Sequence, residues 1–155
     1  MYPFHRINAD SYQFLTNKGI TYIVEFSSAS FYFHPGCQYC QLIEVMSFYP
    51  VGSQKQGFDD EVSETLAGIL RERCNKLSVG ILFICDSSDQ KEICRAKLFE
   101  LWNQKFNGGS HHYQKAKIEY QDGIAYAGLI VSVSNPDAID IINEFRQGAQ
   151  YIASK

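Results

Sequence analysis

An unbroken apolar run at residues 79–85 (V-G-I-L-F-I-C) constrains the fold more than any other part of the sequence. It is rich in branched and aromatic side chains, has no alternating polar face, and ends abruptly at Asp86. A short run of this kind is typical of a β-strand that is covered on both faces. The sequence therefore predicts that residues 79–85 form a central strand of a sheet.

A helical pattern follows this run. Asp89 and Glu92 have the spacing of a capping box, which predicts the start of a helix. A wide apolar face follows, and it includes the only Trp of the chain. We therefore expect a helix over residues 89–106 that covers the central strand. Its two apolar stripes are Cys94, Leu98 and Leu101, and Phe99, Trp102 and Phe106.

Three stretches of the chain resemble a family of small bacterial proteins of unknown function. They are T-N-K-G-I-T-Y (residues 16–22), F-I-C-D-S-S-D (83–89) and R-A-K-L-F-E-L-W (95–102), and the resemblance extends over nearly the whole chain. The family has no activity attached to it. The resemblance therefore implies a fold and an intracellular bacterial setting, and it implies no mechanism.

The remaining elements are predicted from the periodicity of apolar residues and from residues typical of turns. We expect residues 1–10 to be a loosely ordered leader. Together the elements predict an α+β fold in a single domain of residues 1–155, with a mostly antiparallel sheet of order β-β-β-β-α-β-α-β-β-α and the helices packed on one face. The expected strands are 12–16, 20–27, 30–34, 39–49, 79–85, 115–121 and 124–133, and helices begin near Asp59, Asp89 and Pro136.

Composition narrows the setting of the protein. The chain has 155 residues, 45% of them hydrophobic, and a formal charge of −3, which argues against a nucleic-acid partner. The sequence has neither a secretion signal nor an apolar run long enough to cross a membrane. Its five cysteines, an odd number, are expected to be reduced thiols in a cytoplasm. Three of them, Cys74, Cys85 and Cys94, fall at expected core positions.

Two carboxylates follow the central strand, Asp86 and Asp89. Ligands of open α/β sheets bind at the carboxyl ends of strands, and paired carboxylates can hold a divalent cation or share a proton. Arg95 lies six residues beyond Asp89. We favour a structural Asp86–Arg95 ion pair that fixes the turn between strand and helix, and we keep a catalytic or metal role for these three residues as the alternative.

The pattern H-x-x-C-x-x-C places His34, Cys37 and Cys40 at spacings that suit zinc. A fourth ligand would have to come from His111, His112 or another chain. A structural zinc site usually has a second ligand pair in sequence, so two turn cysteines without metal are the favoured interpretation. No cofactor is expected.

One face of the last hairpin is a candidate contact surface for a partner. No complete catalytic or nucleotide-binding motif is present. Tyrosine-rich, half-apolar sheet faces suit protein contacts; a second small core beneath residues 50–57 is the alternative for this face. The residues of this contact surface are Lys115, Lys117, Glu119, Tyr126 and Ile130.

The function favoured by the sequence is therefore a non-enzymatic, intracellular module that binds another protein or itself. Two other classes stay open. One is a metal-dependent hydrolase that uses Asp86 and Asp89, with His111 or His112 as proton carrier. The other is a zinc-stabilised module held by His34, Cys37 and Cys40.

Overall fold

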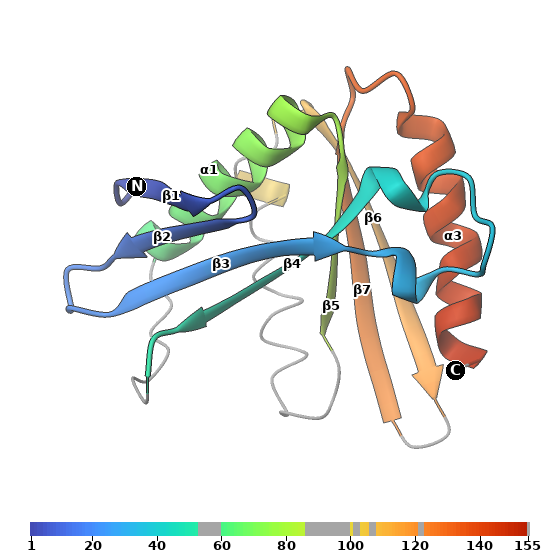
Figure 1. Ribbon diagram of the computed structural model, residues 1–155, viewed down its shortest axis with the longest axis horizontal. Helices are drawn as coiled ribbons and strands as arrows, with labels where there is room; N and C mark the ends of the chain where they lie inside the picture. The colour runs from blue at the N-terminus through green and yellow to red at the C-terminus, as the bar shows by residue number, and fades with distance from the viewer. Residues whose placement is uncertain (53–59, 86–99, 101–102, 106–107, 121–122, 155) are drawn as a thin grey trace.

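The computed structural model describes residues 1–52, 60–85, 100, 103–105, 108–120 and 123–154. These residues form one seven-stranded sheet of order β1-β2-β3-β4-β5-β7-β6 (Figure 1). Neighbouring strands are antiparallel except β4 and β5, which are parallel. The strands are β1 (Phe4–Asn8), β2 (Ser11–Leu15), β3 (Thr21–Ser28), β4 (Ile43–Pro50), β5 (Gly80–Cys85), β6 (His111–Tyr120) and β7 (Gly123–Ser132).

Two long helices accompany the sheet in the described part of the chain. Helix α1 (Asp60–Leu77) connects the parallel strands β4 and β5, and helix α3 (Ala138–Ser154) follows β7. Two short 3-10 helices, η1 (Ser30–Tyr32) and η2 (Cys40–Leu42), lie between β3 and β4. Strands and helices in this arrangement confirm the predicted α+β class and its mostly antiparallel sheet.

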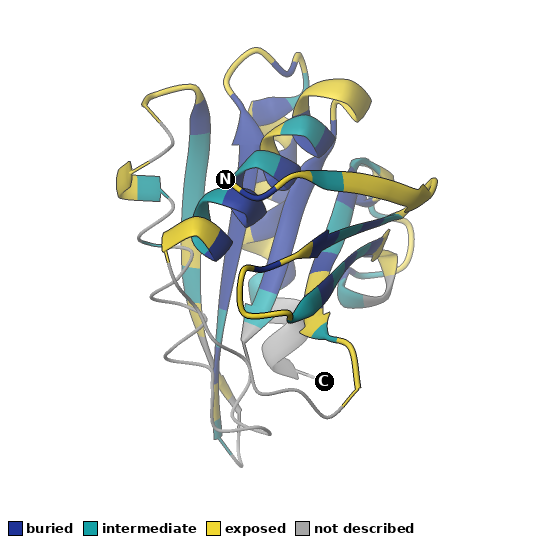
Figure 2. Cartoon of the chain, turned by 90° about the vertical axis from the view of Figure 1, so that its left-hand side faces the viewer, coloured by how far each residue is buried: buried dark blue, intermediate teal, exposed yellow. Residues whose placement is uncertain are grey.

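The apolar run at residues 79–85 is a central strand, as predicted. Strand β5 lies between β4 and β7, and its neighbouring residues Ile81 and Leu82 are both 0% exposed. Ile81 packs into the core under α1, whereas Leu82 packs into the core under α3. The strands at the centre of the sheet are buried and the rim is exposed (Figure 2). A strand that faces a helix layer on each side needs apolar residues at every position, which explains the unbroken run.

The same observation corrects the predicted placement of the helices. Helices α1 and α3 cover opposite faces of the sheet, because consecutive residues of β5 and β7 point to different cores. In β7, Leu129 and Val131 face α3 while Ile130 faces α1. One helix layer would have left half of these side chains in water.

The N-terminal part of the chain differs from the prediction in two places. The expected leader forms the edge strand β1, and Tyr2 is 5% exposed with its backbone N–H donated to Thr65 Oγ1 at 2.8 Å. The strand expected at residues 30–34 is instead the helical turn η1. Phe33 then packs against α3, where Gly148 leaves room for its ring. A tertiary contact thus decides the local conformation at a position where aromatic content alone suggests a strand.

Most of the helix predicted at residues 89–106, including Trp102, lies outside the described residues. Glu100 and residues 103–105 are described, and they are helical.

Candidate functional site

Strands β4 and β5 separate toward their carboxyl ends. They pair only through Ile43–Gly80, Glu44–Ile81 and Val45–Leu82. Beyond these pairs β4 continues to Pro50 beside β3, and β5 continues to Cys85 beside β7. Figure 1 shows the two strands diverging. We call residues 46–50 of β4 and 83–85 of β5 the β4–β5 fork.

Among the described residues, β4 beyond Val45 pairs only with β3, and β5 beyond Leu82 pairs only with β7. In a strand, alternate backbone N–H and C=O groups point to opposite sides, so half of those in residues 46–50 point away from β3. Such edges can pair with any extended chain that carries amide groups. The fork opens at the carboxyl ends of parallel strands, where open sheets bind their ligands.

The two faces of the fork differ in character. On the α1 side, Met46 (4% exposed) and Phe48 (8% exposed) belong to the core and give that side an apolar floor. On the opposite side, Ser47 and Tyr49 are exposed. A ligand chain entering the fork would thus rest on apolar side chains and meet polar groups on its other side.

A titratable pair lies on the polar side of the fork. Tyr49 Oη donates a hydrogen bond of 2.7 Å to Glu25 Oε1 across the β3–β4 pairing. This hydrogen bond to the carboxylate is the main cause that raises the pKa of Tyr49 above its usual value. Tyr49 therefore holds its proton at neutral pH, beside a carboxylate that can accept one.

The first turn of α1, at the open end of the fork, is acidic. Asp60 and Glu61 occupy it, and Lys105 Nζ lies 3.4 Å from Asp60 Oδ1. Acidic side chains suit the positive end of a helix dipole, but they compete with a bound phosphate there. Within the described residues of this turn, no side chain favours a phosphate.

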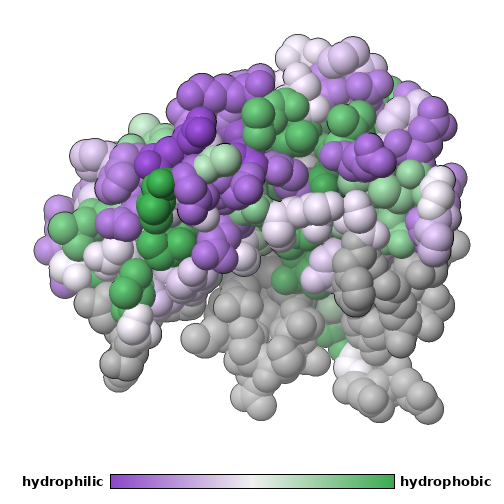
Figure 3. Space-filling model, viewed as in Figure 1, coloured by the Kyte–Doolittle hydropathy of each residue, from purple (hydrophilic) through white to green (hydrophobic). Residues whose placement is uncertain are grey.

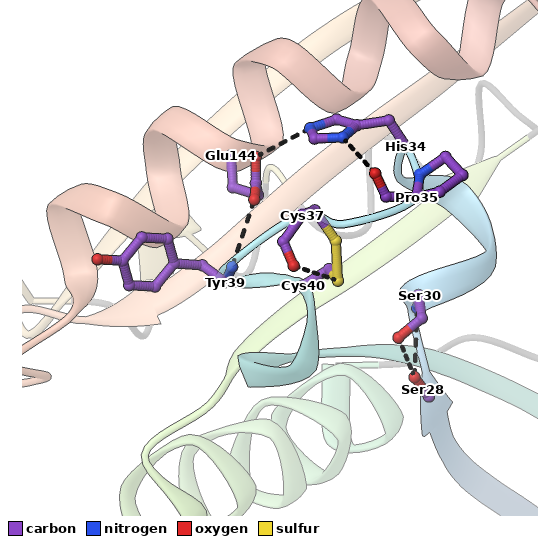
Figure 4. Close-up of a disulfide and its surroundings, with 8 residues drawn as sticks. All are labelled: Ser28, Ser30, His34, Pro35, Cys37, Tyr39, Cys40 and Glu144. Carbon is purple, nitrogen blue, oxygen red and sulfur yellow. Dashed lines mark hydrogen bonds and ion pairs between the residues drawn. A yellow bond between two sulfur atoms is a disulfide. The ribbon is translucent and has the colours of Figure 1, made fainter.

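Cys37 and Cys40 form a disulfide between η1 and η2 (Figure 4). The expectation of reduced thiols is therefore wrong for these two cysteines. In this disulfide form the two sulfurs cannot act as the thiolates that zinc requires, so a zinc site at His34, Cys37 and Cys40 stays a prediction for the reduced protein. The described residues hold no cluster of three or more His, Cys, Asp or Glu that suits a metal. His34 instead faces Glu144, with Nε2 at 3.8 Å from Oε2.

Glu144 of α3 holds the disulfide loop in place. Its side chain is 8% exposed, and Oε1 accepts the backbone N–H of Tyr39 at 3.3 Å. A buried carboxylate needs such partners, because burial without them costs several kcal/mol. In Figure 4 the backbone nitrogen of Tyr39 and the ring of His34 both contact Glu144, while the Tyr39 ring points away from it. Neither contact was predicted from sequence.

His111 lines a polar hollow of about 350 Å³ between the end of α1 and the turn before α3, together with Arg71, Ser132 and Asn135. It is 6% exposed, and burial followed by the charge of Arg71 lowers its pKa. His111 lies opposite Ser132 of β7, whereas Cys85 at the end of β5 lies opposite Tyr126 of the same strand, six residues away. His111 is thus roughly 20 Å from the carboxyl end of β5. It is too remote to move a proton for a site there.

Helix α1 contains a buried guanidinium that was not predicted from the sequence. Arg73 is 2% exposed and donates from Nε and Nη2 to both oxygens of Glu44, at 2.7 and 2.8 Å. It also donates to the Ala9 carbonyl and to Asp10 Oδ1, and it lies 4.9 Å from the Phe26 ring centre. The cluster fastens α1 and the β1–β2 turn to β4 at the closed end of the fork.

The other predicted site residues divide into two groups. Asp86, Asp89 and Arg95 lie outside the described residues, so their roles stay predictions. On the hairpin, Lys115, Lys117 and Glu119 are exposed. Lys115 Nζ lies 2.9 Å from Glu100 Oε1, and Lys117 Nζ lies 3.6 Å from Glu119 Oε1. Tyr126 is half-buried, and Ile130, at 0% exposure, belongs to the core under α1.

Comparison with known proteins places the chain in a family. Residues 58–147 match the family model DUF6169, described as a family of unknown function. The chain therefore belongs to DUF6169, which confirms the resemblance seen in the sequence. A search of curated proteins finds no match to the chain.

Two solved structures resemble the chain. One is a candidate phosphinothricin N-acetyltransferase, with a TM-score of 0.47, 16% identity, and coverage of 83% of this chain and 75% of that one. The other is the CoA-dependent acyl-homoserine lactone synthase MesI, with a TM-score of 0.38, 13% identity, and coverage of 96% and 71%. Both are named as enzymes, so the prediction of a non-enzymatic binding module is corrected. At these identities the activities named for the two structures are not assigned to this chain.

Proposed function

We propose that the protein is an acyltransferase whose acyl donor is a thioester of pantetheine, bound in the β4–β5 fork. The observation that carries the proposal is the loss of pairing between β4 and β5 after Val45 and Leu82. Pantetheine is an extended chain with two amide groups, so it can pair with strand edges as an added strand does. The apolar floor of Met46 and Phe48 suits its methylene and methyl groups.

Glu25 and Tyr49 are the groups placed to assist the transfer. An amine attacks the thioester carbonyl, the C–S bond breaks, and the leaving thiolate takes a proton. Glu25 would accept the proton of the attacking amine, and Tyr49, protonated at neutral pH, would supply one to the thiolate. Their separation of 2.7 Å also lets the proton pass from Glu25 to Tyr49 between turnovers, which restores the carboxylate and the phenol.

The donor has two possible carriers, because pantetheine thioesters are presented both by coenzyme A and by acyl carrier proteins. The acidic first turn of α1 offers little to the phosphates of a nucleotide, so the proposal commits to the pantetheine arm that both donors share. The compartment expected for this reaction is the bacterial cytoplasm, where both carriers occur.

Calorimetric titration with acetyl-CoA and with acetylated acyl carrier protein tests the proposal and separates the two carriers. The variant Ser47→Trp places a bulky ring on the exposed side of the fork, and Ser27→Trp places the same ring on an exposed position of β3 as a control. We expect Ser47→Trp to weaken donor binding about tenfold or more, equal to about 1.4 kcal/mol, and Ser27→Trp to leave it unchanged. Absence of binding by both donors at millimolar concentration would overturn the proposal.

The chemical roles have a separate test. With an amine acceptor that the protein accepts, thiol release from acetyl-CoA should fall about 100-fold or more in Glu25→Gln, in keeping with the usual effect of losing a general base. Donor affinity should not change. Equal turnover in the wild type and in this variant would remove Glu25 from the mechanism.

A further inference from the structure

The Cys37–Cys40 disulfide joins a partly exposed cysteine to a buried one. Cys37 is half-buried at the surface of the loop, whereas Cys40 is 6% exposed and packs into the core under α3. Cys40 Sγ lies 3.5 Å from the carbonyl oxygen of Cys37. Since thiol–disulfide exchange requires direct access to the attacked sulfur, an incoming thiolate can reach Cys37 and not Cys40.

The span of the disulfide suggests a chemical role rather than a stabilising one. The two cysteines are only three positions apart in sequence. A cross-link restricts the unfolded chain more as the loop that it closes becomes longer, so this disulfide restricts it little. In a reducing compartment such as the one expected here, disulfides are usually transient and catalytic or redox-sensing.

The loop that carries the disulfide is fastened to α3 by polar contacts. Glu144 accepts the backbone N–H of Tyr39 and faces the His34 ring, so both ends of the disulfide loop share one carboxylate. A hollow of about 370 Å³ lies beside these contacts, lined by His34, Tyr39, Asp140 and Glu144 among others. Reduction of the disulfide would free the loop between His34 and Tyr39. The contacts of these two residues with Glu144 depend on the shape of that loop.

We propose that Cys37–Cys40 is a thiol–disulfide exchange site that reacts with dithiols through Cys37. A thiolate of the dithiol attacks Cys37 Sγ and the Cys37–Cys40 bond breaks. The products of this step are a mixed disulfide at Cys37 and a Cys40 thiolate that takes a proton from water. The second thiol of the dithiol then attacks the mixed disulfide and releases Cys37. The protein gains two thiols and the dithiol becomes a disulfide, so two electrons pass from one to the other.

The first experiment measures how fast the folded, oxidised protein is reduced by dithiothreitol, with alkylation and mass spectrometry to count thiols. We expect the rate to rise in proportion to dithiothreitol concentration, because the attack occurs on the folded protein. Amide exchange at Tyr39 should become faster on reduction, since its hydrogen bond to Glu144 depends on the loop. A rate that does not depend on dithiothreitol concentration, or no reduction without denaturant, would overturn the proposal.

The second experiment assigns the reactive sulfur with matched single variants. Glutathione disulfide should form a mixed disulfide with Cys40→Ser about tenfold faster than with Cys37→Ser, because only the former keeps the accessible thiol. Cys74, Cys85 and Cys94 are replaced by serine in both proteins, so that each carries a single thiol. Equal rates in the two variants would contradict the assignment. Stoichiometric zinc bound through Cys37 and Cys40 in the isolated protein would overturn the exchange site itself.

Discussion

At the scale of single residues, Arg73 shows how a charge comes to lie inside this fold. Glu44, Asp10 and the Ala9 carbonyl saturate its guanidinium, and the Phe26 ring covers one face. The charge-assisted bonds to Glu44 and Asp10 keep the pKa of Arg73 above its usual value, despite the opposing effect of burial. Arg73 therefore joins α1 to two parts of the sheet.

We predict that Arg73→Ala lowers the free energy of unfolding by about 2–4 kcal/mol, because half-buried Glu44 is left without its partner and the buried contacts of Arg73 are lost. Arg71→Ala, two residues away at an exposed position, should change it by less than about 1 kcal/mol. Urea unfolding of both variants measures the difference. Similar losses of unfolding free energy in the two variants would show that the Arg73 cluster stabilises the fold no more than an exposed arginine does.

His111 gives a prediction for pH. Its pKa is lowered in the folded protein, so the unfolded chain takes up a proton first as the pH falls through about 6.5. The stability that neutral His111 provides is thus present above that pH and is lost as the pH falls through the folded-state pKa. The difference in unfolding free energy between pH 8 and pH 5 should be smaller in His111→Gln than in the wild type. Replacing exposed His5 by Gln is the control, and an unchanged difference in His111→Gln would contradict the assignment.

At the scale of elements, Gly80 determines how closely β5 approaches α3. A Cβ at this position would lie 2.9 Å from Ile141 Cγ2 and 3.2 Å from Leu129 Cδ1. Gly68 differs, because its nearest neighbour would be the flexible Met1 side chain on the surface of α1. The two glycines thus form a matched pair in different surroundings.

We predict that Gly80→Ala lowers the free energy of unfolding by about 1–3 kcal/mol through overpacking. Gly68→Ala should raise it by about 0.5–1 kcal/mol, because alanine favours a helix interior. Thermal or urea unfolding of the two variants separates these effects. A neutral Gly80→Ala would show that α3 lies further from β5 than described.

The elements also show which parts of the fold the sequence could predict. The buried strand at residues 79–85 and the alternating hairpin strands were predicted because burial on one or two faces leaves a clear period in sequence. Strand β1 and turn η1 were missed, because long-range contacts decide them: Tyr2 with Thr65, and Phe33 with Gly148. Local pattern carries no trace of such contacts.

At the scale of the whole molecule, the proposed function depends on where strand pairing ends. Helix α1 connects two parallel strands inside an otherwise antiparallel sheet, and those strands share only three pairs. Sequence pattern predicts strands but not the point where two of them separate, so the β4–β5 fork could not be found from sequence. The Glu25–Tyr49 pair was missed for the same reason, since its residues are 24 positions apart and meet only through the β3–β4 register.

In Figure 3 the hydrophobic side chains of the described face lie among hydrophilic ones. Among the described residues, no helix is long and apolar enough to cross a membrane.

Amide chemical shifts, followed by NMR while acetyl-CoA or acetylated acyl carrier protein is added, test the β4–β5 fork most directly. The fork predicts that the largest changes fall on residues 46–49 of β4 and 83–85 of β5, where the strands have lost each other as partners. The changes should disappear in Ser47→Trp and persist in Ser27→Trp. Changes confined to the His111 hollow or to the exposed face of β6, with the fork undisturbed, would contradict a ligand site between β4 and β5.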